Sequence, residues 1–450
     1  MKYTYHIYSQ ILKYKNKDRC RFHMPGHKQA FDFKKFFPIA PLDVTELSYS
    51  DDLQCPTGAI KSAQEDIANL IGAKYSYITT DGSTSGVMAM LYVASRHGNK
   101  IIVPRNSHKS VFNACRLLQL EPVIVQGEEC EGVLLPPEVC LIERLIKADK
   151  DIAGLIVTSP DYYGNVAPLE EYARVLKENG RLLLVDGAHG SHLIYEEDRP
   201  LHASGYADAW VDGAHKTLPT LTQGAVVSIN NEQIKSEIEE GLSIFRTSSP
   251  SYPIMASVEY GVKLIHYYHD VLRRAKASVL EIKEYLKDKI TFYPSADWTK
   301  IAVDFKSIDV NPDLIVPVLE KKGIYAELCD GRYIIFYASP MMEPARINEL
   351  QAVLFWVCSQ KKFRGTYKQK PSIPQTDRTY SYLYALKRES EYINLDDAVG
   401  KMSAENVGVS PPCVPVIVAG EIITEQAVNY LKENEKTFGV VDGKVKVVKK

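Results

Sequence analysis

Two short stretches of the chain place a lysine and an aspartate where they could serve one cofactor. Lys216 lies within residues 210–224, between His215 and a turn rich in proline and threonine. Upstream, an apolar run at 182–185 ends in Asp186. An amine that bonds to an aldehyde, with a carboxylate that keeps a ring nitrogen protonated, suits pyridoxal phosphate. Taken alone, Lys216 would be read as a surface lysine beside a structural histidine.

A segment rich in glycine, serine and threonine could hold the phosphate of such a cofactor. Gly82, Ser83, Thr84 and Ser85 open an apolar stretch with helical spacing. Free N–H groups, hydroxyls and the positive end of the helix dipole together make such a helix start a phosphate site. Ordinary helix capping also explains serine and threonine there. The segment therefore supports the cofactor only in combination with Lys216 and Asp186.

A mostly parallel sheet is the element that would position these residues. Between residues 100 and 230, β-rich runs alternate with helical segments, which is typical of a parallel sheet covered on both faces. The runs lie at 100–103, 122–125, 152–158, 181–185, 207–211 and 224–228. Ligands bind such sheets at the carboxyl ends of the strands. Polar segments at 107–108, 158–164 and 215–216 fall at those ends, as does Asp186.

The rest of the chain divides into further parts. We predict an N-terminal arm over 1–55, a large domain over 56–290, a small α+β domain over 291–365 and a C-terminal domain over 379–450. A linker is expected at 366–378. Helical spacing continues to about residue 290, long enough to bridge two domains. In the small domain, strands are expected at 300–305, 323–328 and 332–337.

Composition excludes several classes of function. The net charge of −2 gives no electrostatic case for nucleic acid or an anionic membrane surface. The eight cysteines are scattered without a C-x-x-C pair, so we expect reduced thiols and neither disulfides nor a zinc site. His23 and His27 flank a Pro-Gly pair and are not expected to form a metal site. Without an apolar N-terminal region or membrane-length run, a soluble cytoplasmic enzyme is expected.

Taken together in chain order, the motifs resemble the fold-type-I, pyridoxal-phosphate-dependent ornithine/lysine/arginine decarboxylases. The resemblance is to the short form without an N-terminal wing domain, and it implies a major domain built on a seven-stranded, mostly parallel sheet. The matching stretches lie at 24–28, 51–53, 56–64, 82–86, 105–109, 186–190, 215–219, 247–252 and 415–421. Their spread over nearly the whole chain makes the set specific, which no single motif would be.

The resemblance implies a role for each candidate site residue. Lys216 would bond to the cofactor, and Asp186 would pair with its ring nitrogen. His108 would stack on one face of the ring with Ala188 on the other, and His189 would contact the ring hydroxyl or carry a proton. The phosphate would be held by Gly82, Ser83, Thr84, Ser85, His215 and, across a dimer interface, Ser249. For His108 and His189, a structural hydrogen-bonded histidine is the alternative.

The reaction implied is decarboxylation of arginine, lysine or ornithine to the corresponding amine. The resemblance also implies a homodimer with shared active sites and a place in polyamine biosynthesis. An aminotransferase, or a lyase acting at Cβ, would need the same cofactor residues and stays open as an alternative. A non-catalytic cofactor-binding protein is disfavoured because Lys216, Asp186 and His108 are all present.

Three positions depart from the family pattern. Gly213 and Ala214 stand where the family commonly has serine or threonine before the lysine, so one hydroxyl contact to the phosphate is expected to be absent. Asp161 stands where a neutral residue is usual and would be either a turn residue or a carboxylate that faces a cationic substrate. Arg332 is also unexpected, and we interpret it as an exposed surface residue.

Overall fold

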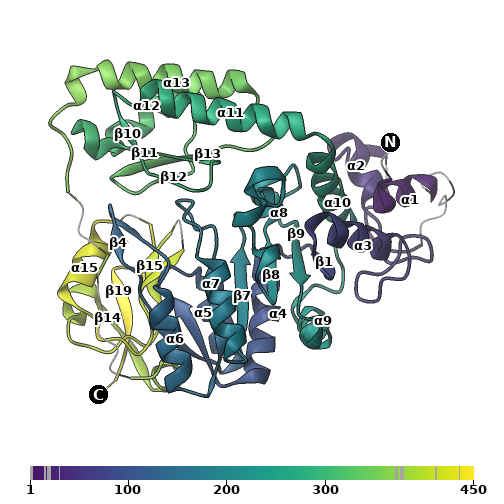
Figure 1. Ribbon diagram of the computed structural model, residues 1–450, viewed down its shortest axis with the longest axis horizontal. Coiled ribbons are helices and arrows are strands. Elements are labelled where there is room, and N and C mark those ends of the chain that lie inside the picture. The colour runs from purple at the N-terminus through teal and green to yellow at the C-terminus, as the bar shows by residue number, and fades with distance from the viewer. Residues whose placement is uncertain are drawn as a thin grey trace. The chain divides into compact units, whose positions relative to one another are not determined.

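The computed structural model describes residues 4–14, 17, 22–29, 31–369, 373–374, 380–410, 413–434 and 436–449. The chain forms two compact units, and Figure 1 labels their helices and strands. The first unit comprises Met1–Val93 and Leu183–Leu272, and the second comprises Ala94–Leu182 and Arg273–Lys450. Part of the expected linker at 366–378 lies outside the described residues.

A seven-stranded sheet with the order β1-β9-β8-β7-β6-β2-β3 is the main element of the fold. Its strands, in that order, are Tyr75–Thr79, Ala225–Ile229, Ala209–Asp212, Leu182–Gly187, Ile152–Thr158, Lys100–Pro104 and Glu121–Val125. β9 runs antiparallel to β1 and β8, whereas β7 pairs with β8, and β2 with β3 and β6, in parallel. Every residue of β7 and β8 is buried, as expected for strands covered on both faces. The predicted fold class is confirmed.

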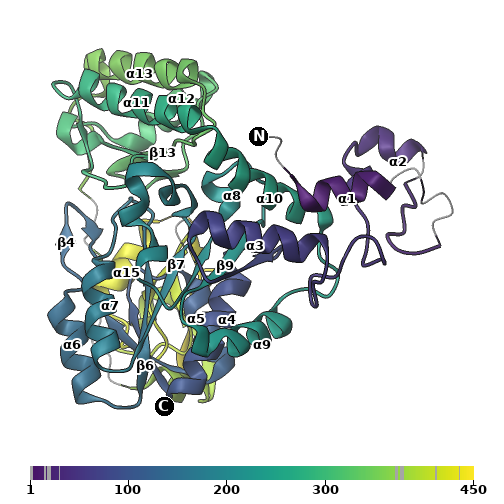
Figure 2. The ribbon, with the colours of Figure 1, turned by 45° about the vertical axis from the view of Figure 1, so that its right-hand side comes forward.

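Helices of the first unit pack on its strands and on one another. α3 (Ala59–Ile71) buries a stripe at helical spacing and contacts β1, α1 (His6–Tyr14) and α10 (Tyr252–Tyr267). Figure 2 shows α3 lying across the strands of this unit. α9 (Lys235–Phe245) packs against α4 (Gly82–His97), where Gly241 lies close to Ala89. α2 (Phe31–Phe36) belongs to the N-terminal segment.

The start of α3 is fixed by a carboxylate from the motif at 51–53. The Asp51 carboxylate accepts hydrogen bonds from the backbone N–H groups of Thr57, Gly58 and Ile60, each at 2.9 Å. Partial burial opposes the charge, but hydrogen bonds from these backbone groups outweigh it and lower the pKa of Asp51. Asp51 therefore satisfies donors that a helix start leaves without a partner.

Replacing Asp51 with asparagine is expected to lower the free energy of unfolding by about 1 kcal/mol at neutral pH. Asparagine tolerates the positive φ of 70° at this position, so the change isolates the lost charge. A folded-state pKa that is lowered gives stability above the unfolded pKa of about 4. That stability disappears as the pH falls through the folded pKa. Urea denaturation across acidic pH should therefore show the wild-type advantage shrinking, and an advantage that grows with acidity would contradict this account.

The second unit contains a smaller antiparallel sheet with the order β10-β11-β13-β12. These strands are Thr291–Phe292, Lys300–Asp304, Tyr333–Tyr337 and Leu328–Cys329. Figures 1 and 2 both show α12 (Val316–Lys321) and α13 (Pro344–Ser359) together over this sheet, beside α11 (His269–Leu286). The same unit holds α5 (Lys109–Leu118), α6 (Val139–Ala148) and α7 (Leu169–Glu178).

The last part of the chain forms two three-stranded sheets around α15 (Glu425–Lys432). One sheet has the order β14-β19-β18, and its strands are Ser390–Asn394, Lys444–Val448 and Val440–Val441. The other has the order β16-β15-β17, and its strands are Val414–Ile417, Val407–Val409 and Thr437–Phe438. Glu421, fully buried, forms an ion pair with Arg105 at the end of β2. Two of the motifs, 105–109 and 415–421, therefore meet within the second unit.

Among the residues that the structure describes, no helix combines the length and the apolar content that a bilayer crossing requires.

Candidate active site

Lys216 and His189 lie in direct contact. Lys216 lies in the short helix α8 (Ala214–Thr217), which follows β8, and His189 follows the end of β7. The Lys216 Nζ atom is 3.0 Å from Nε2 of His189, whose side chain is buried. β7 and β8 are parallel neighbours in which Asp186 pairs with Val211. The segments that follow β7 and β8, which contain His189 and Lys216, therefore meet at one edge of the sheet.

Asp186 is a buried carboxylate with no cationic partner in the part of the chain that the structure describes. It is 3% exposed, and one of its oxygens accepts a hydrogen bond from the Ala188 N–H group at 3.2 Å. It makes no ion pair with any residue that the structure describes. Burying a carboxylate without a cation costs free energy. Its surroundings therefore fit a ligand that brings its own positive charge, such as a protonated ring nitrogen.

Hydrogen bonds to residues 223 and 224 connect the start of α4 with the segment that contains Lys216. Gly82 has a φ of 71°, a conformation that favours glycine, and its N–H group donates to the Gln223 carbonyl at 2.9 Å. His215 contacts the neighbouring Gly224 carbonyl through its N–H group at 3.1 Å and through Nδ1 at 2.9 Å. Burial lowers the pKa of His215. Residues 223–224 thus bring the proposed phosphate segment and His215 together.

Two of the residues predicted to bind the phosphate, Ser85 and Ser249, have hydroxyl groups that contact other protein side chains. Ser85 is buried, and its hydroxyl contacts Oγ1 of Thr79 at 2.7 Å, so it holds α4 to β1. Ser249 is exposed and lies 3.3 Å from the Thr247 hydroxyl. The Thr247 N–H group donates to Asp81, the residue before Gly82, at 3.4 Å. The segment around Ser249 therefore lies beside the start of α4 in its own chain, and its role across a dimer interface stays a prediction.

His108 begins α5 in the second unit. Its Nδ1 atom accepts a hydrogen bond from the Ser110 N–H group at 3.2 Å and lies 2.8 Å from the Ser110 hydroxyl. This capping contact fixes the ring orientation and is the structural role that the sequence left open. Stacking of His108 on the cofactor stays a prediction, as does contact between the ring and Ala188.

Gly213 explains one departure from the family pattern. A Cβ atom at this position would lie 2.5 Å from the Ala188 carbonyl oxygen, closer than real contacts allow. A serine therefore does not fit at residue 213 without displacing the backbone that follows Asp186. Close packing against the segment that follows β7 thus excludes a serine at residue 213, whereas this contact does not explain Ala214.

Replacing Gly213 with serine is expected to lower the free energy of unfolding by about 1 to 3 kcal/mol, the range found for overpacked sites. It should also weaken cofactor binding, because Lys216 lies only three residues away. Urea denaturation and titration of the apoenzyme with pyridoxal phosphate measure the two effects. Gly205→Ser is the matched control, since a Cβ atom at residue 205 meets nothing within 4 Å. Equal behaviour of the two variants would contradict this explanation.

Asp161 is a turn residue, one of the two readings that the sequence allowed. One carboxylate oxygen accepts from the Tyr163 N–H group at 2.8 Å, and the other accepts from the Asn165 side chain at 2.7 Å. Burial, only partly offset by these hydrogen bonds, raises the pKa of Asp161 to about 6.

The interpretation of Arg332 as an exposed surface residue is wrong. Its side chain is 16% exposed and forms ion pairs with Asp304, at 2.7 Å, and with Glu131. The guanidinium also lies over the ring of Tyr333, 4.9 Å from its centre. The sequence alone could not predict these ion pairs, because Glu131 and Asp304 lie far from Arg332 along the chain.

Known proteins share both the fold and the sequence pattern of this chain. The fold matches solved lysine decarboxylases: that of Francisella novicida (TM-score 0.80, 19% identity, 99% of this chain and 81% of that chain) and the constitutive enzyme of Escherichia coli (0.79, 19%, 99% and 82%). Models of the Orn/Lys/Arg decarboxylase major domain and C-terminal domain match residues 6–302 and 360–443. The chain belongs to the Orn/Lys/Arg decarboxylase family.

Relatives in sequence cover nearly the whole chain. The uncharacterized protein YaaO of Bacillus subtilis is 31% identical over 99% of this chain and 97% of its own length. The arginine decarboxylase of the same organism is 28% identical over 95% of this chain and 93% of its own length. The predicted family, the enzyme class of amino-acid carboxy-lyase and the cofactor pyridoxal phosphate are confirmed.

Proposed function

We propose that the protein decarboxylates a basic amino acid to its amine and carbon dioxide, and that arginine is the first substrate to test. Three relatives named arginine decarboxylases align with 95%, 97% and 95% of this chain. A lysine decarboxylase of Escherichia coli aligns with 50% of it. The structural observation that carries the proposal is Asp186, a buried carboxylate without a cationic partner among the described residues. It lies in β7, and the chain that follows β7 and its neighbour β8 makes the Lys216–His189 contact.

Each residue of this edge has a task that follows from its position. Pyridoxal phosphate, when bound, supplies an aldehyde that bonds to amines and a ring that accepts the electron pair released at Cα. Lys216 would hold the aldehyde end, and Asp186 would face the ring nitrogen and favour its protonated form. The start of α4, with Ser83, Thr84 and His215, would hold the phosphate.

Proton transfer is the task of the Lys216–His189 pair. The distance of 3.0 Å between Nζ and Nε2 is short enough for a proton to pass between the two atoms. Loss of carbon dioxide leaves Cα in need of a proton, and either side chain can deliver it. His189 is 5% exposed, so a protein side chain delivers the proton to Cα, and that side chain takes a replacement proton from water before the next turnover.

The proposal also covers the oligomeric state, the cellular location and the pathway of the enzyme. A homodimer, with Ser249 completing the partner's phosphate site, is supported by exposed apolar side chains in the N-terminal segment: Phe22, Phe36 and Phe37 are 96%, 75% and 54% exposed. We place the enzyme in the cytoplasm and its amine product in polyamine synthesis. Sedimentation of the purified protein tests the dimer.

The reaction itself is tested by product analysis. The holoenzyme is incubated separately with arginine, lysine and ornithine, and carbon dioxide and primary amine are both measured. We expect equal amounts of the two from one of these substrates. Citrulline is the matched control, because it has the length of arginine but carries a neutral urea group in place of the guanidinium. We expect it to be a poor substrate. Formation of a keto acid or ammonia without carbon dioxide would instead indicate an aminotransferase or a lyase acting at Cβ.

A further inference from the structure

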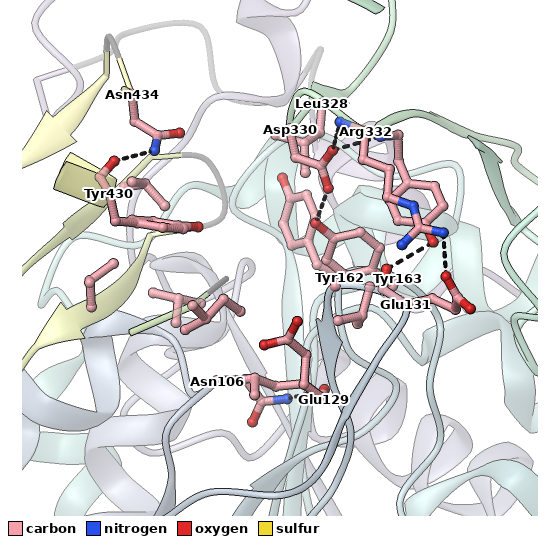
Figure 3. A pocket seen from close by; sticks show the side chains of 18 of the residues that line it. Asn106, Glu129, Glu131, Tyr162, Tyr163, Leu328, Asp330, Arg332, Tyr430 and Asn434 are labelled. Carbon is pink, nitrogen blue, oxygen red and sulfur yellow. Dashed lines mark hydrogen bonds and ion pairs between the residues drawn. The ribbon is translucent and has the colours of Figure 1, made fainter. Parts of the chain in front are cut away.

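A cavity of about 400 Å³ lies within the second unit. Its walls come from the end of β2, from the hairpin of β4 (Glu129–Cys130) and β5 (Val133–Leu134), from the turn after β6, from the β12–β13 region and from α15 (Figure 3). None of the residues proposed to hold pyridoxal phosphate lines it. The cavity is therefore built by residues that the proposed reaction does not use.

Aromatic rings form much of the wall. The tyrosines that line the cavity are Tyr162, Tyr163, Tyr333, Tyr367 and Tyr430. Two of them are held in place by hydrogen bonds: the Tyr163 hydroxyl donates to Asp330 at 2.6 Å, and the Tyr333 hydroxyl donates to the Glu131 carbonyl at 3.0 Å. Aromatic faces attract organic cations.

The positive charges of the wall are largely matched by protein carboxylates. Arg105 is paired with Glu421, and Arg332 is paired with Asp304 and Glu131. Lys306, the remaining cation of the wall, is exposed, as Glu129 is, and its charge acts on Glu131. A ligand with a carboxylate or phosphate would therefore find few partners here.

Glu129 supplies a negative charge that no described cation of the protein matches. Its carboxylate makes no hydrogen bond or ion pair with any residue in the described part of the chain. Figure 3 shows it projecting into the space between Tyr430 on one side and Tyr162 and Tyr163 on the other. Asp330 contributes a second carboxylate to the same cavity.

Hydrogen-bond acceptors complete the lining. The side-chain N–H groups of Asn106 and Asn434 donate to the carbonyls of Leu134, at 3.5 Å, and Tyr430, at 2.7 Å, which leaves their amide oxygens as acceptors. Burial, with Asp330 and Glu129 as negative neighbours, raises the pKa of Tyr430 to about 12. The Tyr430 hydroxyl makes no hydrogen bond with a described residue and is open to a ligand.

We propose that this cavity binds a linear primary amine as a cation, with Glu129 as the anchor of its ammonium group. The choice of amine rests on the proposed function: decarboxylation removes the carboxylate, for which this cavity has few partners, and keeps the positive charge that it can hold. The site therefore distinguishes the product of the reaction from its amino-acid substrate. It gives the enzyme a place to bind its product apart from the residues around Lys216.

Calorimetric titration with 1,4-diaminobutane, 1,5-diaminopentane and agmatine tests the site. The holoenzyme is first reduced with borohydride, which fixes the cofactor to the protein and removes amine binding at the catalytic edge. We expect saturable binding of at least one amine, weakened about tenfold or more by Glu129→Gln, since a charge-assisted hydrogen bond is lost. Glu128→Gln is the matched control, because Glu128 is an exposed carboxylate in the same hairpin that does not line the cavity. 1,5-Pentanediol, of similar shape but uncharged, should not bind.

The outcomes are distinct. Equal amine affinity in wild type and Glu129→Gln, or no saturable binding in wild type, would overturn the proposal. Tyr430→Phe provides a second variant that removes only a hydroxyl, and it should weaken binding without loss of the folded state. Amine binding by a protein that releases no carbon dioxide would defeat the proposed function and leave the site standing. Decarboxylation without amine binding in the cavity would defeat the site alone.

Discussion

Lys216→Ala is expected to lower turnover with the preferred basic amino acid by about 10³-fold or more. The substitution removes the Nζ atom, which we propose bonds to the cofactor and which lies 3.0 Å from Nε2 of His189. It should also remove the yellow colour that a lysine-bound cofactor gives the purified protein. Steady-state release of carbon dioxide and the visible absorption spectrum measure the two effects.

A lysine elsewhere in the first unit provides the control. Lys61 lies on α3, its side chain is 58% exposed, and it pairs with Glu65 at 4.0 Å. Lys61→Ala should keep full activity and colour, because an exposed ion pair contributes little. Undiminished turnover in Lys216→Ala would remove Lys216 from the chemistry.

Asp186→Asn is expected to lower kcat by about 10²- to 10³-fold, the range seen when one preorganised electrostatic group is removed from an active site. Asparagine has nearly the same shape and can still accept the Ala188 N–H hydrogen bond through its amide oxygen. It cannot match the positive charge of a protonated ring nitrogen. The kinetic constants, together with the affinity for pyridoxal phosphate, measure the effect.

Asp208→Asn is the matched control for Asp186. Its carboxylate accepts from the Leu183 N–H group at 2.8 Å and from the Asn231 side chain at 2.9 Å, so it joins the start of β7 to the segment that follows β9. We expect a loss of stability in this variant, with kcat changed far less than in Asp186→Asn. Similar losses of kcat in the two variants would show that Asp186 acts only through the fold.

The sequence predicted the central strands well, because strands buried on both faces are continuous apolar runs. The runs at 100–103 and 152–158 appear as β2 and β6. β1 was missed, since it mixes tyrosine with Ser76. The polar Ser76 is accommodated by a contact of 2.8 Å with the Ser228 hydroxyl in β9, a partner that only the folded sheet reveals.

Segments whose structure depends on tertiary packing were predicted less well. The helical region expected to reach residue 290 is interrupted at Tyr268, between α10 and α11, where no proline or glycine marks the break. The strand expected at 323–328 is reduced to Leu328–Cys329, the part that pairs with β13. Local propensity was overridden there because only those residues reach a partner strand.

The contact between Lys216 and the segment after Asp186 could be predicted, because parallel strands end at one edge of a sheet. The distance to His189 could not, since two histidines, His189 and His192, follow Asp186 in sequence and only geometry separates them. The cavity around Glu129 also left no signal, because its wall is assembled from segments far apart in the chain.

The central claim is that Lys216 holds pyridoxal phosphate at the edge formed by β7 and β8. Borohydride reduction of the holoenzyme, followed by proteolysis and mass spectrometry, locates the attachment to a single side chain. The reduced cofactor should be recovered on the peptide that contains Lys216. Recovery on a peptide from any other lysine, or on none, would contradict the claim.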